Sequence, residues 1–227
     1  MKKINHPLVK GVVKEVKPKI YCVTVDDDYD RAMLFCRYQE FYESPYKKFR
    51  GKPFTWMQYM RHYKSVWKKR VFTYPEDWSG YNIPSNVMQK ANHIFCGETE
   101  YDDIMNDIYF YCAIDSQNKN NNTRCDWYLI GASSKDLKTM DHEIAHGLYF
   151  TNKDYRKNAN KLISEIKPKD YEKSKKILIK MGYVGDKKII DDEIQAFMST
   201  GLYNGLDIKQ LKKYEKRFVD NFKKYIK

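Results

Sequence analysis

Residues 142–146 read His-Glu-Ile-Ala-His, and this segment constrains the fold more than any other part of the chain. In an α-helix, residues four positions apart lie one turn apart on the same side. A helix through the segment therefore presents the side chains of His142 and His146 together. Ser133 and Asp136 can cap the start of such a helix, so we predict a helix that runs to about Phe150.

The apolar residues around this segment fit the same helix. They form one stripe along it, at Leu137, Met140, Ile144 and Leu148. His142 and His146 fall on the side away from the stripe, whereas core histidines would fall within it. We therefore interpret the two histidines as functional residues; the alternative is a pair of solvated histidines on a helix surface.

Two imidazoles held one turn apart can bind the same metal ion. Glu143 lies to one side of them, where its carboxylate can take a proton from a water molecule that the metal activates. Zinc in catalytic sites has three protein ligands and one position open to water. The motif supplies two of these ligands, so the third must come from another part of the chain.

A third histidine ligand downstream of the motif is excluded. The other histidines all precede it, at His6, His62 and His93, and the pattern HExxHxxGxxH fails at Tyr149 and Asn152. The acidic candidates that follow are Asp154, Glu165, Glu172, Asp191, Asp192 and Glu193. We favour Glu193, because it lies on a predicted helix over 186–200 whose small Ala196 permits close approach to the first helix. The alternative is an ordinary charged position on a helix surface.

The two segments HEIAH (residues 142–146) and DEIQAF (residues 192–197) together resemble the gluzincin group of zinc metallopeptidases. In that group, HExxH is followed by a glutamate ligand on a second helix. The resemblance covers roughly residues 126–205. It implies Zn²⁺ as cofactor, His142, His146 and Glu193 as its ligands, Glu143 as general base, and a peptide or protein as substrate.

One position departs from this pattern. Many gluzincins carry an acidic residue one turn after the ligand glutamate, where it supports a histidine, and here that place is Phe197. We expect Asp141, Asp191 or Asp192 to orient an imidazole instead. Residues 37–84 also resemble uncharacterised viral or phage proteins with a downstream HExxH, which implies a viral origin and a place in the host cell or virion.

The fold class predicted from the remaining pattern is α+β. Residues 108–114 and 126–130 are rich in β-branched and aromatic residues, and we predict that they form a hairpin around an exposed loop at 118–122. Residues 20–25 read as a further strand. We expect one domain over 1–227, with an N-terminal subregion at 1–90. The metallopeptidase-like core at 91–227 would pack a small antiparallel sheet on a mostly helical C-terminal half that carries the zinc-binding helix.

Further helices are predicted from apolar spacing and from capping residues. They cover residues 30–42, a segment starting after Thr55, a short one opened by Pro84, and the stretches 153–166, 170–181 and 186–200, with a last helix capped by Asp207. Residues 70–86 are predicted to be irregular. Trp56, Met60, Tyr63 and Trp67 share a helical spacing that favours a core position over nucleic-acid stacking.

The chain carries a formal net charge of +12, from 42 Lys and Arg against 30 Asp and Glu. A nucleic-acid partner would explain this balance. The biased usage of Lys, Asn, Tyr and Ile explains it as well, and we favour that account. The five cysteines are odd in number and lack any CxxC pair, which indicates reduced thiols. We expect a cytoplasmic protein without a membrane-spanning segment.

Three functions are compatible with these features of the sequence. We expect a zinc-dependent metallopeptidase, because Glu143 is intact; the alternatives are a non-catalytic metal-binding protein and a nucleic-acid-associated basic protein. For a peptidase, we expect residues 126–130 to form the strand at the cleft edge that pairs with extended substrate. Candidate donors to an oxyanion are Tyr149, Tyr155 and Tyr203. Glu40 and Glu43 are interpreted as solvated residues.

Overall fold

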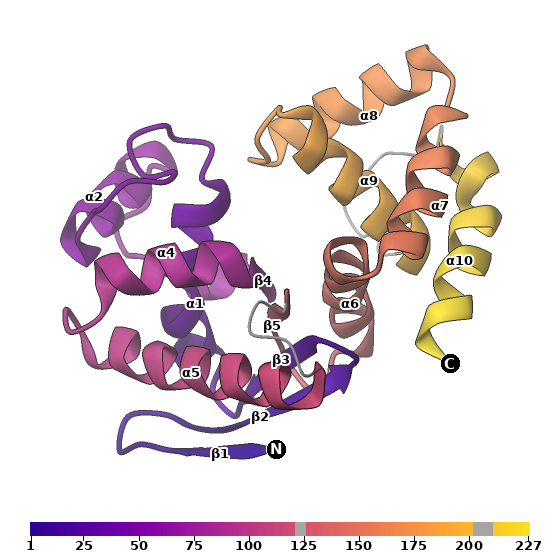
Figure 1. Ribbon diagram of the computed structural model, residues 1–227. Coiled ribbons are helices and arrows are strands. Elements are labelled where there is room, and N and C mark those ends of the chain that lie inside the picture. Colours follow the sequence, from indigo (N-terminus) through magenta and orange to yellow (C-terminus); the bar gives the residue numbers. More distant parts are fainter. Residues whose placement is uncertain (121–125, 202–210) are drawn as a thin grey trace.

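A five-stranded sheet lies at the centre of the molecule, in a computed structural model that describes residues 1–120, 126–201 and 211–227 (Figure 1). Its strands are β1 (Lys2–Asn5), β2 (Lys10–Lys17), β3 (Ile20–Val25), β4 (Gly80–Pro84) and β5 (Tyr128–Ala132), and their order is β1-β2-β3-β5-β4. The β3–β5 pair is parallel and the others are antiparallel. The predicted α+β class is confirmed, but the sheet is mixed and not purely antiparallel.

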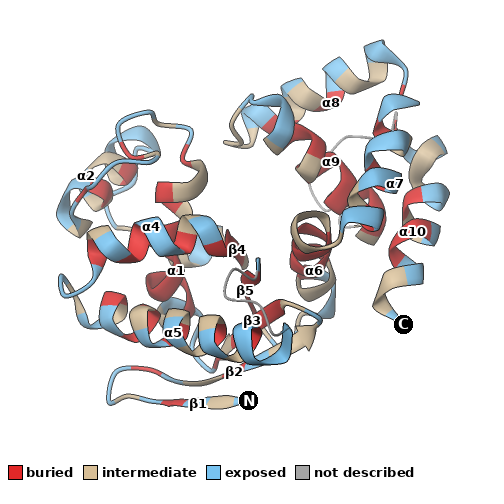
Figure 2. Ribbon diagram, viewed as in Figure 1, coloured by how far each residue is buried: buried red, intermediate tan, exposed pale blue. Residues whose placement is uncertain are grey.

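Both faces of the central strands are covered by helices, so β5 is buried along its whole length. Alternate side chains of a strand point to opposite faces. Tyr21, Val23 and Leu129 belong to the core on the side of helix α1 (Asp28–Glu43). Ile20, Cys22, Tyr128 and Ile130 belong to the core on the side of helix α6 (Leu137–Thr151). Figure 2 shows this burial along the strands and the inner sides of the helices.

Helices surround the sheet from both halves of the chain. In the N-terminal half these are α1, α2 (Trp56–Val66), α3 (Tyr74–Asp77), α4 (Ser85–Phe95) and α5 (Glu100–Asn120). In the C-terminal half they are α6, α7 (Lys153–Ser164), α8 (Pro168–Lys180), α9 (Lys187–Thr200) and α10 (Lys212–Ile226). The predicted helices near 30–42, after Thr55 and after Pro84, and those of the C-terminal half, are confirmed within a few residues. The predicted cap at Asp207 lies outside the described residues.

The hairpin predicted from residues 108–114 is wrong, because this segment lies within α5. The buried residues of α5 recur every three or four positions, at Ile104, Met105, Ile108, Cys112 and Ser116. This helical period outweighs the local preference of the run IYFYCAI for a strand. Residues 70–86, predicted to be irregular, contain both α3 and the outer strand β4.

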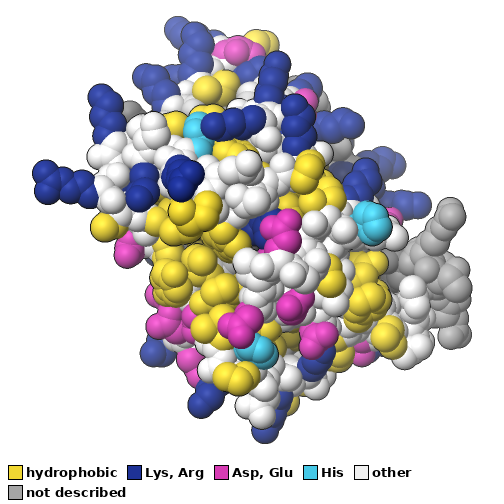
Figure 3. Space-filling view, turned by 90° about the vertical axis from the view of Figure 1, so that its left-hand side faces the viewer, with side chains coloured by type: hydrophobic (Ala, Val, Ile, Leu, Met, Phe, Trp, Pro, Cys, Tyr) yellow, Lys and Arg dark blue, Asp and Glu magenta, His cyan; other side chains and the backbone are white. Residues whose placement is uncertain are grey.

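The surface around α2 is strongly basic. Residues 44–75 contain nine Lys or Arg and no Asp or Glu. Trp67 and Val71 are exposed within this run, so the predicted core position of Trp67 is wrong, while Tyr63 of the same helix is buried. Figure 3 views the molecule from the α2 side and shows Lys and Arg side chains around hydrophobic ones.

Two further predictions concern the described residues only. None of the helices in these three ranges combines the length and the apolar character that crossing a bilayer requires. The cysteines that they include, Cys22, Cys36, Cys96 and Cys112, are free. The predicted division of the chain at residue 90 stays a prediction, although strands from residues 2–84 share one sheet with β5.

Candidate metal centre

Helix α6 holds the HExxH segment and is buried on two sides. Asp136 caps it, because its carboxylate accepts a hydrogen bond from the Thr139 amide at 3.1 Å. Ile144 and Leu148 pack towards the sheet, as the stripe predicts. His142 and His146 are nevertheless only 5% and 2% exposed. The alternative of two solvated surface histidines is therefore wrong, and the side away from the stripe faces a second protein layer.

That second layer is α9, which brings Glu193 beside the two histidines. Asp186 caps α9 and Gly201 ends it in the left-handed conformation, both as predicted. Ala145 of α6 and Ala196 of α9 are fully buried in the same cluster, so small side chains lie where these helices meet. The side-chain Nε2 of Gln195 donates to the backbone carbonyl oxygen of Ala145 at 3.3 Å, which ties α9 to α6.

The ligand atoms of these three residues converge on one point. The Nε2 atoms of His142 and His146 lie 3.2 Å apart. The Glu193 carboxylate lies 3.9 Å from His142 Nε2 and 3.7 Å from His146 Nε2. Ligands at about 2.0–2.1 Å from a tetrahedral zinc ion are separated by about 3.3 Å. The three side chains therefore fit a zinc ion with small adjustments, and all three are buried.

The polar atoms of the cluster also fit a bound cation. Glu193 Oε2 is buried and has no hydrogen-bond partner among the described residues. A buried acceptor without a partner is costly, and a metal ion would satisfy it. Two imidazole nitrogens and one carboxylate are the donor set of several catalytic zinc sites. Glu193 is thus the only acidic candidate within the described residues that joins the histidines as a possible ligand.

Asp192 orients one of the imidazoles. Its Oδ1 atom lies 2.9 Å from His146 Nδ1 and also accepts a hydrogen bond from Gln195 Nε2 at 2.8 Å. Asp191 points elsewhere, since it accepts hydrogen bonds from Tyr171 and Lys187. Among the three aspartates proposed from the sequence, Asp192 is therefore the one hydrogen-bonded to a ligand histidine.

His142 has no comparable support. Its ring packs against Phe197, with ring centroids 4.6 Å apart, at the position where many gluzincins have an acidic residue. His142 Nδ1 is buried without a hydrogen-bond partner among the described residues. The departure seen in the sequence thus changes the surroundings of one histidine and leaves the convergence of the ligand atoms intact.

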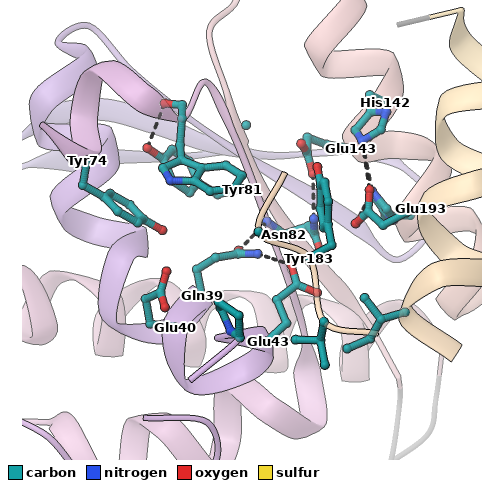
Figure 4. A pocket seen from close by; sticks show the side chains of 17 residues that line it. Gln39, Glu40, Glu43, Tyr74, Tyr81, Asn82, His142, Glu143, Tyr183 and Glu193 are labelled. Atoms are coloured by element: carbon teal, nitrogen blue, oxygen red, sulfur yellow. Dashed lines mark hydrogen bonds and ion pairs between the residues drawn. The ribbon is translucent and has the colours of Figure 1, made fainter. Parts of the chain in front are cut away.

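Glu143 points to the flank of the histidines and is held by the outer strand β4. Asn82 Nδ2 donates to Glu143 Oε2 at 3.0 Å (Figure 4). The Tyr128 hydroxyl in turn donates to Asn82 Oδ1 at 2.6 Å. Gly80 allows β4 to pass close to α6, since an added Cβ would meet the Glu143 carboxylate and come within 2.7 Å of Thr139 Cγ2. The sequence predicted Glu143 at this site but gave no sign of the support from β4.

Burial and neighbouring charges together shift the pKa values of this group. It lowers the pKa of His142 well below its usual range and raises the pKa of Glu193 well above it. Burial also lowers the pKa of His146, but Asp192 and Glu193 outweigh this effect and raise it well above the usual range. Burial raises the pKa of Glu143 to about 7, while neighbouring His146 and the hydrogen bond from Asn82 lower it.

A pocket that opens to solvent lies beside the cluster. It is lined by His142, Glu143, His146 and Glu193, by β4, by Gln39, Glu40 and Glu43 of α1, and by residues 182–184 before α9 (Figure 4). Burial and nearby charges raise the pKa of Glu43 to about 8. The interpretation of Glu40 as a solvated residue is wrong, because this residue is only 7% exposed, whereas Glu43 is partly buried and lines the same pocket.

The tyrosine that lies beside the candidate metal centre, Tyr183, was not among the three predicted from the sequence. Tyr183 lines the pocket and its hydroxyl bonds to Glu193. Tyr155 instead bonds to Gln195 and Ser199 in the core, and Tyr149 lines a neighbouring pocket. Tyr203 lies outside the described residues. No spacing in the sequence distinguishes Tyr183, because its position depends on the loop that connects α8 to α9.

Comparison with known proteins adds no relative. No protein-family model, no curated protein and no solved structure matches the chain at a significant level. The resemblance to gluzincins thus depends on the residues of the two segments and on the geometry described above.

Proposed function

We propose that the protein is a zinc-dependent metallopeptidase that hydrolyses peptide bonds in peptide or protein substrates. One observation carries the proposal: the ligand atoms of His142, His146 and Glu193 converge beside the Glu143 carboxylate at the wall of an open pocket. A metal site that only stabilises the fold needs neither a free acid next to the metal nor access from solvent. This arrangement therefore favours catalysis over a purely structural metal.

A zinc ion, when bound, lowers the pKa of water and polarises the carbonyl group of the scissile bond. Glu143 accepts the proton of the attacking water and passes it to the leaving amine. Its pKa of about 7 suits a group that gains and loses a proton near neutral pH. Asn82 fixes the position of this carboxylate. Tyr183 lies where its hydroxyl can donate to the developing oxyanion.

Substrate would enter along β4, which is the outer strand of the described sheet on the side of the metal centre. An extended peptide can add to a free strand edge by backbone hydrogen bonds. The Asn82 amide donates to Gln39 Oε1 at 3.1 Å, so the Gln39 side chain occupies this edge and must move when a peptide pairs there. The strand at 126–130, which we expected at the edge, lies inside the sheet.

Metal analysis combined with a general-base variant tests the proposal. We expect about one zinc per chain in the parent and its loss in His146→Ala. Glu143→Gln should keep zinc and lose hydrolysis of a mixed peptide library, and retained turnover would exclude Glu143 as the base. If Glu193→Ala binds zinc as tightly as the parent, the third ligand is another residue.

The basic surface around α2 supports a second candidate function, which is association with nucleic acid. Its nine cations without an acidic residue and the exposed Trp67 suit phosphate contacts and base stacking. We expect a labelled single-stranded RNA to bind with an affinity that falls steeply with salt. Replacing residues 68–70 by Gln should weaken binding far more than replacing the exposed Lys173, Lys176 and Lys180 of α8.

A further inference from the structure

The pocket beside the metal centre carries an unusual balance of charge. Four glutamates line it, at Glu40, Glu43, Glu143 and Glu193, and none of its described lining residues is Lys or Arg. The chain as a whole has a net charge of +12. Acidic side chains are therefore concentrated in this pocket although the protein as a whole is basic, and the composition alone does not explain it.

A bound zinc ion balances only part of this charge. Its two positive charges are offset by the carboxylates of Glu193 and Glu143, and ligand histidines are neutral. Glu40 and Glu43 then have no cation near them within the described lining of the pocket. Carboxylates in poorly solvated surroundings need a partner of opposite charge or hydrogen-bond donors.

These two glutamates lie on one side of α1, since residues three apart on a helix are neighbours. The Gln39 amide donates to Glu43 from one turn earlier. Glu40 receives support from the hydroxyls of Tyr59, Tyr74 and Ser44, but its Oε2 atom is buried and has no hydrogen-bond partner among the described residues. This unpartnered acceptor at the pocket wall indicates a ligand with a donor or a positive charge.

The walls between these carboxylates and the outer strand are aromatic. Tyr74, Trp78 and Tyr81 line the pocket, with the ring centroids of Tyr74 and Tyr81 6.3 Å apart in a stacked arrangement. Aromatic faces attract cations and pack against the apolar stems of long side chains. A Lys or Arg side chain has both a stem and a terminal cation. The N-terminal amine of a peptide has no such stem to fill the space between the rings.

We propose that this pocket is a subsite for a Lys or Arg side chain of the substrate next to the scissile bond, with Glu43 and Glu40 as the acceptors of its cation. The inference names a substrate class for the metallopeptidase and therefore rests on the proposed function. Hydrogen bonds between charged groups predict that a cationic residue is preferred to a neutral one by about 10- to 100-fold in kcat/KM.

Two peptide libraries test this subsite with the zinc-loaded full-length protein. Both are acetylated and amidated at their ends, and the second carries Gln at every Lys and Arg of the first. We expect cleavage next to Lys or Arg in the first library and slow cleavage in the second, as found by mass spectrometry. A third library with free N-termini tests whether the pocket recognises a terminal amine instead. Efficient cleavage of this third library alone would overturn the proposal.

Variants locate the preference within the pocket. Glu43→Gln and the double variant Glu40→Gln/Glu43→Gln should reduce the ratio of kcat/KM between matched Lys and Gln peptides towards one. Glu100→Gln removes an equal charge at an exposed position outside the pocket and should leave the ratio unchanged. A Lys preference that survives in the double variant, or a parent without preference, overturns the proposal.

Failure of the peptidase function has a separate outcome. If the zinc-loaded parent cleaves no peptide, the proposed function is wrong. Calorimetry with acetyl-Ala-Lys-Ala-amide and acetyl-Ala-Gln-Ala-amide then tests the subsite alone. Binding of the Lys peptide that disappears in Glu43→Gln supports a cation site, and equal binding of both peptides overturns it.

Discussion

Removing the carboxylate of Asp192 should weaken zinc binding without removing a ligand. Asp192 Oδ1 lies 2.9 Å from His146 Nδ1, and the Asp192 side chain is 19% exposed, so this is a partly desolvated, charge-assisted contact. Such partners of ligand histidines typically account for about 10- to 100-fold in metal affinity, or about 1.4–2.8 kcal/mol. We expect Asp192→Ala to reduce zinc affinity near the upper end of this range, because the variant removes both the charge and the acceptor that fixes the His146 ring. Asp192→Asn keeps an acceptor and should lose less.

Competition with a zinc-binding fluorophore at constant pH measures this effect. Asp191→Ala is the matched control, because it removes the neighbouring carboxylate, which bonds to Tyr171 and Lys187 away from the ligands. Thermal unfolding of the metal-free variants separates loss of affinity from loss of fold. The reasoning is refuted if Asp192→Ala binds zinc as tightly as the parent, or if Asp191→Ala weakens binding equally.

Three further predictions follow from the surroundings of Glu143 and α1. The hydrogen bond from Asn82 lowers the pKa of Glu143, so Asn82→Ala should shift the acid limb of the kcat/KM profile to higher pH, and an unmoved limb would contradict this role. In the metal-free protein, burial raises the pKa of Glu40 from 4.5 to about 7 and, together with nearby charges, that of Glu43 to about 8. Between the unfolded pKa of 4.5 and these raised folded values, the folded state binds more protons than the unfolded state. The free energy of unfolding should therefore fall as pH rises from about 4.5 to 8. Melting curves in a chelator should show this slope, and it should be flatter in Glu43→Gln. Gly80→Ala places a methyl group against the Glu143 carboxylate, so kcat should fall while zinc content, measured by mass spectrometry, stays unchanged.

The two histidines of the candidate metal centre could be predicted from the sequence because their geometry is local. Four-residue spacing on one helix determines that His142 and His146 share a side. Ala196 and the caps at Asp186 and Gly201 made the helix of Glu193 recognisable. The burial of the two histidines, however, depends on which element covers the side of α6 that faces away from the sheet. The pattern of a single helix carries no information about that element.

The remaining parts of the site could not be predicted, because they join segments that are distant in the chain. Asn82 reaches Glu143 across 61 residues, and Glu43 enters the same pocket from the end of α1. Neither contact has a repeating pattern in the sequence. The missed helix at 108–114 shows a related limit: its β-branched and aromatic residues favour a strand locally, and only its packing against α1 and the sheet decides for a helix.

The parallel pairing of β3 with β5 has a consequence for the order of events during synthesis. Residues 20–23 can pair with 128–131 only after more than a hundred intervening residues have left the ribosome, and Glu193 emerges later still. A nascent chain therefore displays both histidines before it has the third side chain of the candidate metal centre. The proposed hydrolytic centre therefore cannot assemble before residue 193 has emerged, which protects the preceding segments while they are being made.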